Sequence, residues 1–256
     1  MYATTIVQAL ALVLGTAAGA LWPREPQPVF SRDFWINVAT GALLFPVRAG
    51  LTLLGVNTLY EGKVALFHLG TLGHPVLQFL FAFLLLDLAK YWVHYADHRV
   101  PFLWRFHRVH HSAEHLDAST GLRMHVVDFL QLSAIPVVLF GVIFDISGFA
   151  PWVLPASLCV GIVADALEHM NVRMTLDTPL MRFWYATFNS PLFHSWHHVR
   201  DGHLCDGNYA NCLPLWDRLF RTDVARDLPP EVYGVAKGPL EDSFVGLHLL
   251  RPRASP

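Results

Sequence analysis

The sequence is poor in charged residues and in cysteine. Only 15% of its 256 residues are charged, against roughly 25% in a typical soluble domain, and 54% are hydrophobic. This balance favours a membrane protein over a soluble one. A net charge of −2 leaves no global basic signal, so we expect no nucleic-acid partner. The three cysteines form no CxxC pair, which excludes a zinc ribbon and gives no disulfide framework.

Five stretches are apolar enough to predict membrane helices, which need about 20 mostly apolar residues. They cover approximately residues 6–22, 34–56, 75–93, 126–144 and 149–167. The first has no basic residue ahead of it and no convincing cleavage site, so we interpret it as an anchor rather than a removed signal peptide. We therefore expect an all-α integral membrane bundle of four to five membrane helices, with a histidine-rich helical cap.

The connection between the fourth and fifth predicted helices is only residues 145–148, which indicates a tight hairpin. The segments before and after this pair must then lie on the same membrane face, even if both helices are re-entrant. Four arginines lie between residues 94 and 125 and nine basic residues follow residue 167, whereas residues 57–74 contain only Lys63. The positive-inside rule places the former two segments in the cytoplasm.

Histidine is the residue present in excess. Twelve of the 15 histidines fall between residues 94 and 203, and most belong to one HxxxH motif and two HxxHH motifs. Residues three or four apart share a helical face, so we expect three one-faced sets at the cytoplasmic membrane surface. The eight motif residues are His94, His98, His107, His110, His111, His194, His197 and His198.

Eight imidazoles indicate two metal ions. Neutral imidazole binds iron, zinc and copper, and a single ion with open positions needs only about three protein ligands. Two adjacent ions could share the electrons that activate dioxygen. Nearby carboxylates should balance the charge and accept hydrogen bonds from the ligand rings. The candidates are Asp87, Asp97, Asp128, Asp165 and Glu168.

The remaining histidines divide into weaker candidates and bystanders. His169, at the end of the fifth predicted helix, is the expected ninth ligand. His125, at the start of the fourth, is either a tenth ligand or a structural interfacial residue. We expect solvated roles for two loop histidines, a position on the opposite face for two more, and a place in the tail for the last. These are His115 and His203, His68 and His74, and His248.

Residues 84–222 resemble the fatty acid hydroxylase superfamily, also called the sterol desaturase family. The resemblance rests on the three ordered histidine motifs and on the flanking patterns Arg123-x-His125, His169-x-Asn171-Val-Arg173, Asn208-Tyr209 and Trp216-Asp217-Arg218-Leu219-Phe220. There are three departures. Asp128 stands where the family often has glutamate, Ala210 where it often has glycine, and Arg221 where glycine is usual.

This resemblance implies an iron-dependent, oxygen-using hydroxylase or desaturase of a membrane lipid. The family acts on sterols, fatty acyl chains, alkylglycerol ethers or carotenoids. It implies that the eight motif histidines hold two non-haem irons, with zinc as a possible substitute on purification. Without a fused cytochrome b5-like domain, electrons would come from a separate ferredoxin or cytochrome b5 type partner. Residues 1–74 would then be N-terminal membrane helices, 75–222 the catalytic domain, and 223–256 a polar, peripheral tail.

Other functions remain open. A zinc-dependent membrane hydrolase usually carries HExxH, which is absent here. A metal transporter would place its ligands near mid-membrane, whereas these motifs fall at helix ends and in loops. A bis-histidine haem carrier would show a Soret band. A silent family member would bind lipid or metal without oxygenase turnover.

Overall fold

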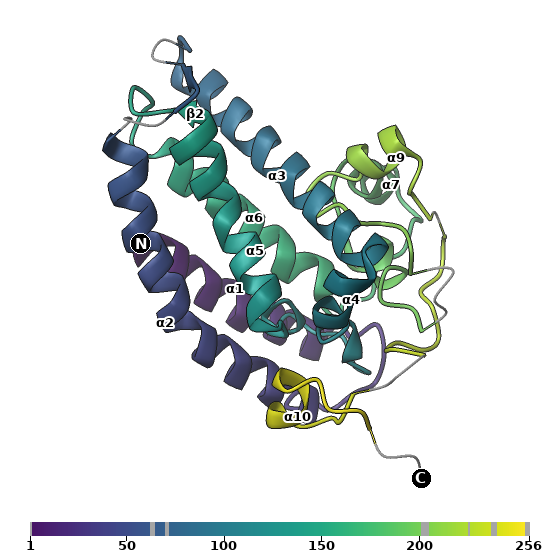
Figure 1. The fold of residues 1–256 in the computed structure, drawn as a ribbon. Helices are drawn as coiled ribbons and strands as arrows, with labels where there is room; N and C mark the ends of the chain where they lie inside the picture. Colours follow the sequence, from purple (N-terminus) through teal and green to yellow (C-terminus); the bar gives the residue numbers. More distant parts are fainter. Residues whose placement is uncertain are drawn as a thin grey trace.

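The protein is a bundle of long helices with short helices gathered at one end (Figure 1). The computed structural model describes residues 2–61, 65–69, 72–200, 205–224, 226–236 and 240–253. The all-α prediction is confirmed. The long elements are α1 (Tyr2–Leu21), α2 (Arg32–Glu61), α3 (Pro75–Arg99), α5 (Val126–Val137) continued by the π-helix η3 (Val138–Ile143), and α6 (Val153–His169). The short ones are α4 (Pro101–His107), η1 (His110–Ser112), η2 (Thr120–Leu122), α7 (Pro179–Thr187), α8 (Pro191–Ser195), α9 (Leu215–Phe220) and α10 (Phe244–His248).

Three stretches of the described residues are long and apolar enough to cross a membrane. They are Ala3–Leu21, Pro75–Arg99 and Val126–Ile143. Leucines such as Leu10, Leu77 and Leu80 point outward from them and are about half exposed, which suits a lipid environment. The other two predicted helices exist as α2 and α6, and α6 has 17 residues. Whether α2 and α6 also span the bilayer stays a prediction.

The helix α3 runs along the bundle, and its C-terminal end carries His94 and His98. Pro75 occupies its first turn, where a missing N–H is tolerated, and the Nδ1 of His74 accepts a hydrogen bond from the Val76 amide. The helix ends just before Pro101, because a proline disfavours helical backbone in the residue that precedes it. Its apolar face packs into a core with α5 and α6 through Ala82 and other residues. The buried members of that core are Ala82, Leu86, Ile135, Phe140, Phe149 and Val153.

The α5–α6 hairpin folds as predicted. Pro136 lies inside α5 and lacks an amide hydrogen, and the helix changes to the π-helical η3 two residues later. A short parallel pairing of β1 (Phe67–His68) with β2 (Phe144–Asp145) then closes the turn at the end of the bundle opposite α4 (Figure 1). His68 lies at this end, and its Nδ1 is 3.1 Å from Asp145 Oδ2. The segments before α5 and after α6 therefore meet at the other end.

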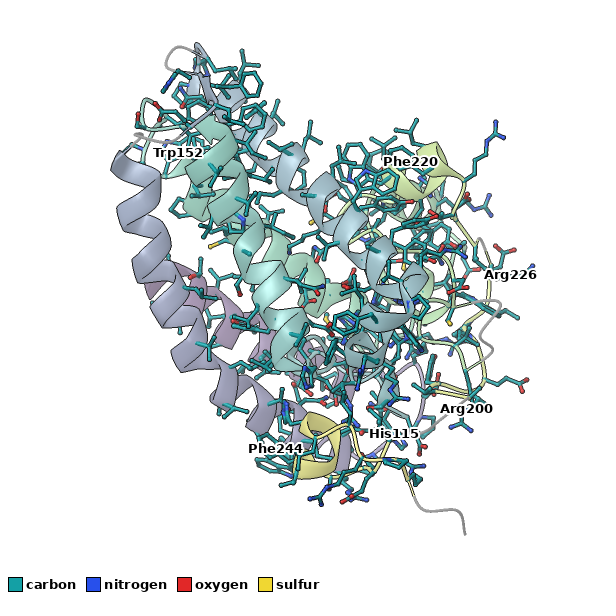
Figure 2. All side chains as sticks on the ribbon, viewed as in Figure 1. His115, Trp152, Arg200, Phe220, Arg226 and Phe244 are labelled. Carbon is teal, nitrogen blue, oxygen red and sulfur yellow. The ribbon has the colours of Figure 1, made fainter. Side chains whose placement is uncertain are left out.

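The C-terminal segment is packed rather than peripheral. Leu240 and Leu247 are buried with Ile36 of α2 and Val109. Within the same segment, the carboxylate of Asp242 pairs with a fully buried arginine. The prediction of a peripheral tail is wrong for these residues, because their apolar side chains cover the end of α2. Figure 2 shows the side chains of this region beside Phe244, away from the end where Trp152 lies.

Candidate metal centre

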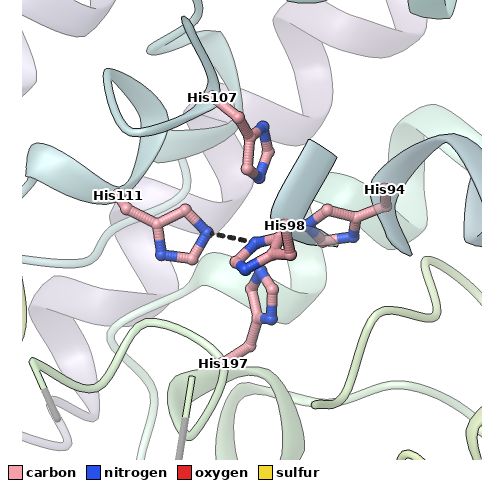
Figure 3. A group of neighbouring side chains, drawn as sticks. All are labelled: His94, His98, His107, His111 and His197. Carbon is pink, nitrogen blue, oxygen red and sulfur yellow. Dashed lines mark hydrogen bonds between the residues drawn. The ribbon is translucent and has the colours of Figure 1, made fainter. Parts of the chain in front are cut away.

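Nine histidines from segments far apart in the sequence converge on two adjacent groups. Within each group, the ring nitrogens that could bind a metal lie within 4.8 Å of one another. The rings of His111 and His198, one from each group, are 4.5 Å apart between centroids, so the groups touch. The first group contains His94, His98, His107, His111 and His197 (Figure 3). The second contains His110, His169, His194 and His198.

Each HxxHH motif divides its members between the two groups. In the first motif, His107 and His111 join one group, and His110 joins the other. In the second, His197 is separated in the same way from His194 and His198. The three rings of each motif nevertheless lie within 5.5 Å of one another, between centroids, so each motif turns its rings toward the common centre while it supplies both groups. The division between the groups has a geometric cause, because α4 ends at His107 and consecutive residues of a helical turn point roughly 100° apart.

In the five-histidine group, unprotonated nitrogens point into a common space. The Nδ1–H groups of His94 and His197 donate to the carbonyl oxygens of Tyr209 and Gly207, each at 2.8 Å. A carbonyl can only accept, so Nδ1 carries the proton and Nε2 holds the lone pair. Both Nε2 atoms, and that of His107, are buried without a hydrogen-bond partner. Orphaned buried acceptors are costly, and a shared cation would satisfy them.

In the four-histidine group, the unprotonated ring nitrogens face one another directly. His110 donates from Nδ1–H to the Arg123 carbonyl at 3.2 Å, and His169 donates to the Asp165 carbonyl at 2.7 Å. Their Nε2 atoms therefore both carry lone pairs, yet they lie 3.2 Å apart. The Nε2 of His194 is 3.1 Å from that of His169. Facing lone pairs repel unless a cation lies between them, so this group fits a metal ion.

Burial favours the neutral form of most of these rings. Desolvation, reinforced by neighbouring histidines, lowers the pKa of His110, His111 and His198 well below the ordinary value. Burial lowers the pKa of His197 to about 3. For His107, burial acts in the same direction, but the hydrogen bond and charge of Asp128 outweigh it and raise the pKa. Neutral imidazole is the form that binds metal.

Comparison with known proteins agrees with this geometry. A model of the fatty acid hydroxylase family matches residues 79–222. The chain belongs to this family. It is 29% identical over 166 residues to the alkylglycerol monooxygenase of Danio rerio, an alignment that covers 60% of this chain and 32% of the relative. It is 33% identical over 153 residues to the ornithine lipid hydroxylase of Rhizobium tropici, which covers 57% and 41%.

A human alkylglycerol monooxygenase matches to the same extent as the fish protein, with 29% identity over 166 residues. The chain spans between about a third and two fifths of the length of these three relatives. No solved structure matches the chain.

The structure shows the setting of two residues that depart from the fatty acid hydroxylase pattern. Asp128, where the family often has glutamate, still reaches His107, with its Oδ2 3.3 Å from Nδ1. Arg221 ends α9 in the left-handed conformation, at φ 59° and ψ 43°. Glycine adopts that backbone most easily, which explains its usual presence at this position in the family.

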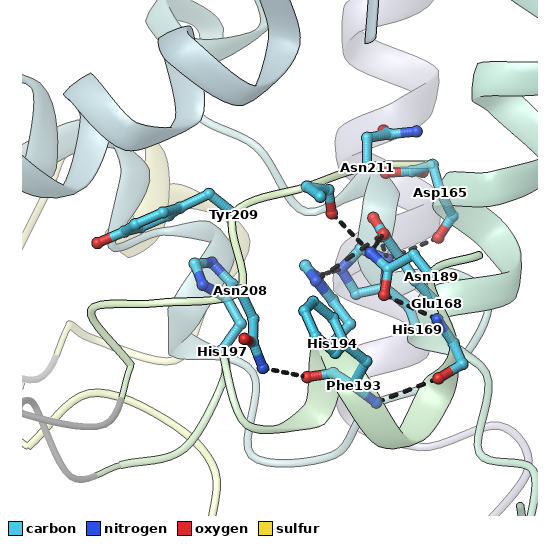
Figure 4. Close-up of polar contacts among 12 residues, drawn as sticks. Asp165, Glu168, His169, Asn189, Phe193, His194, His197, Asn208, Tyr209 and Asn211 are labelled. Atoms are coloured by element: carbon cyan, nitrogen blue, oxygen red, sulfur yellow. Dashed lines mark hydrogen bonds and ion pairs between the residues drawn. The ribbon is translucent and has the colours of Figure 1, made fainter. Parts of the chain in front are cut away.

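The other predicted acidic residues differ in how they contact the histidine rings. Glu168 is buried, with its oxygens 3.8 Å from the Nδ1 atoms of His169 and His194, and the Asn189 amide holds it (Figure 4). Asp165 contributes its backbone carbonyl to His169. Asp97 lies in a buried cluster with His107 and Asp128.

Asp87 holds a loop rather than a histidine ring. Its carboxylate accepts hydrogen bonds from the backbone amides of Cys212 and Leu213 and from the indole of Trp216, at 3.0, 3.2 and 2.9 Å. It therefore fixes the loop that leads to α9.

The structure does not bring His125 into either group. Its Nδ1 accepts from the Val127 amide at 3.2 Å, as the cap of α5, and its Nε2–H donates to the His248 carbonyl at 3.2 Å. Both ring nitrogens are thus engaged away from the centre. His115 lies at the surface, where its side chain is 47% exposed, and His203 lies outside the described residues.

Sequence reasoning assigned no role to Asp217, which shapes the five-histidine group indirectly. It is fully buried and accepts hydrogen bonds from the amides of Tyr209 and Ala210, at 2.8 and 2.9 Å. The carbonyls of Gly207 and Tyr209, on the same loop, orient His197 and His94. The Trp216-Asp217 pattern in the family resemblance was the available signal.

Replacing Asp217 with asparagine should weaken metal binding by the five-histidine group. The amide would turn N–H groups toward backbone donors and release the loop, and loss of a partner behind a ligand typically lowers metal affinity about 10–100-fold. Competition titration with a chelator measures this. The exposed Asp227→Asn is the matched control and should bind as the unsubstituted protein does. Equal affinities in the two variants would contradict this role.

Proposed function

We propose that this protein is a membrane-bound non-haem di-iron oxygenase that hydroxylates or desaturates a C–H bond of a lipid. The observation that carries the proposal is the pair of touching histidine groups, whose buried acceptor nitrogens converge. Its family membership supports this, as do relatives named for lipid hydroxylation and alkylglycerol monooxygenation. The substrates that fit are lipids with a long hydrocarbon chain, among them alkylglycerol ethers and fatty acyl chains.

We assign the metals to nine histidines and leave out His125. The five-histidine and four-histidine groups would each hold one iron. Bound there, the two irons would supply reduction of dioxygen and oxidation of an unactivated C–H bond, with two external electrons per cycle. The Asp128 carboxylate and the backbone carbonyls behind the rings would keep five imidazoles in the tautomer that points the Nε2 lone pair at the metal, namely His94, His107, His110, His169 and His197.

The protein's own contribution is position and exclusion of water. Seven of the nine converging histidines are buried, and the groups lie at the end of α3, whose other end reaches into the predicted membrane core. A lipid chain that descends along the bundle would meet the centre at the boundary of the bilayer. We propose that residues 75–222 form the catalytic unit. The distribution of arginine supports a cytoplasmic position for this end, and electrons would come from a separate ferredoxin or cytochrome b5 type protein.

Oxygen incorporation tests the proposal. Purified protein reconstituted with iron in lipid nanodiscs, with ¹⁸O₂ and a reducing system, should convert an added lipid to a product that carries ¹⁸O or lacks two hydrogens. An alkylglycerol, a fatty acid and an ornithine lipid are the first three substrates to try. The anaerobic reaction is the control. An iron-loaded, reduced protein that leaves all lipids in the nanodisc unchanged under oxygen would contradict the proposal.

A further inference from the structure

The helix α7 has one apolar face that no described part of the chain covers. None of its nine residues is buried. Leu180, Phe183 and Trp184 lie on one side, and they are 64%, 61% and 38% exposed. The opposite side faces the protein: the Tyr185 hydroxyl donates to the Arg226 carbonyl at 3.4 Å, and its ring packs on Phe193.

The neighbouring α9 extends this apolar surface. The Arg218 guanidinium donates to the carbonyls of Tyr185 and Ala186, which fixes α9 against the end of α7. The side chain of Asp217 is buried on the inner side of α9, whereas Leu215 and Leu219 are 51% and 60% exposed. We call the combined surface the apolar shelf. It consists of Leu180, Phe183, Trp184, Leu215, Leu219 and Phe220.

The shelf is continuous with the lipid-facing side of α3. The ring of Phe220 lies 4.7 Å from that of Trp92 and 5.3 Å from that of Tyr91, between centroids. Trp92 is itself 44% exposed, and the exposed Leu84 and Leu80 follow it along α3. Figure 2 shows Phe220 beside the histidine-bearing half of α3, with Arg226 further out. The shelf therefore joins a predicted spanning helix at the level where tryptophan marks the edge of a bilayer.

We propose that the apolar shelf lies within the bilayer interface on the histidine side, with its side chains inserted among the lipid chains. Water-soluble surfaces rarely expose such a patch, and the continuity with α3 favours lipid over a protein partner. Exposed Arg182, Arg218 and Arg221 border the shelf and suit anionic headgroups.

The position of the apolar shelf affects where the histidine groups lie relative to the membrane. The shelf helices bracket residues 188–214, which contain three of the nine converging histidines. Immersion of the shelf would therefore set the height of the histidine groups relative to the lipid chains.

Site-directed spin labelling measures the immersion. Phe183→Cys and Leu219→Cys, each carrying a nitroxide, are reconstituted as full-length protein in vesicles of phosphatidylcholine and phosphatidylglycerol. Leu80→Cys on α3 is the lipid reference. Leu228→Cys is the water reference, because this leucine is 75% exposed and follows Arg226, whose carbonyl contacts Tyr185 on the side of α7 opposite the apolar face. The unsubstituted chain, with its three native cysteines, gives the labelling background.

The expected result is that oxygen relaxes the labels at 183 and 219 as it does at 80, while a water-soluble nickel chelate relaxes only the label at 228. Relaxation of both shelf labels by the nickel chelate would place the shelf in water and overturn the inference. Protection from both reagents would overturn it in favour of a protein contact. Dipolar broadening between the labels of different chains would then identify a second copy as that contact.

Discussion

Replacing His110 with alanine is expected to abolish lipid oxidation. The substitution removes one of the four imidazoles that meet in the four-histidine group. The Arg123 carbonyl also loses the hydrogen bond that it accepts from this ring. Because loss of a residue behind a ligand already lowers metal affinity about 10–100-fold, loss of a ligand should exceed that. Turnover should fall by more than about 100-fold, since two metals act together on dioxygen. His197→Ala should do the same through the five-histidine group.

Product formation and bound iron are measured together for these variants. His115→Ala is the matched control, because it removes a surface imidazole from the same region without touching either group. It should retain both turnover and iron. Near-normal turnover in His110→Ala or His197→Ala, in folded protein, would refute the ligand assignment.

Replacing Arg123 with leucine is expected to destabilise the fold itself. Arg123 is fully buried, and its guanidinium pairs with Asp33 at 2.9 Å and with Asp242 at 3.2 Å. The arginine also donates to Asn37 and thus joins α2, the turn before α5 and the C-terminal segment. Removing one partner of a buried ion pair leaves an uncompensated charge, here that of Asp33. The free energy of unfolding should fall by about 3–5 kcal/mol.

Denaturant unfolding of metal-free protein in detergent measures this difference without interference from bound iron. The control is Arg253→Leu, because Arg253 is 42% exposed and pairs with Glu114 at 3.2 Å in a similar contact at the surface. An exposed pair of this kind contributes about 0–1 kcal/mol. Equal stability of the two variants would show that the buried network does not hold the C-terminal segment in place.

Local patterns predicted the helices well because their information lies in consecutive residues. The apolar runs and the short turn after η3 determined the hairpin, and the hairpin determined which histidines meet. The HxxxH of α3 also behaves as its spacing requires, with His94 and His98 in one group. Each of these features depends on helical periodicity and chain connectivity, and on nothing distant in the sequence.

Tertiary contacts decided the features that the sequence did not reveal. The division of each HxxHH motif follows from where α4 and α8 end, which depends on how those short helices pack. His125 lies on the expected side, but its ring is taken by Val127 and by the carbonyl of His248, 123 residues away. Asp217 acts through a loop, so its role is visible only once the loop carbonyls are seen to face His94 and His197.

The metal content of the purified protein decides whether the two histidine groups form a di-iron centre. Protein expressed with ample iron, extracted in detergent and shown to be folded, is analysed for iron and zinc per chain beside the His110→Ala variant. We expect about two irons per chain and fewer in the variant. If zinc is present first, the same stoichiometry is expected after iron reconstitution. Intact, folded protein that binds neither metal, even after reconstitution, would show that the histidine groups are not a metal centre.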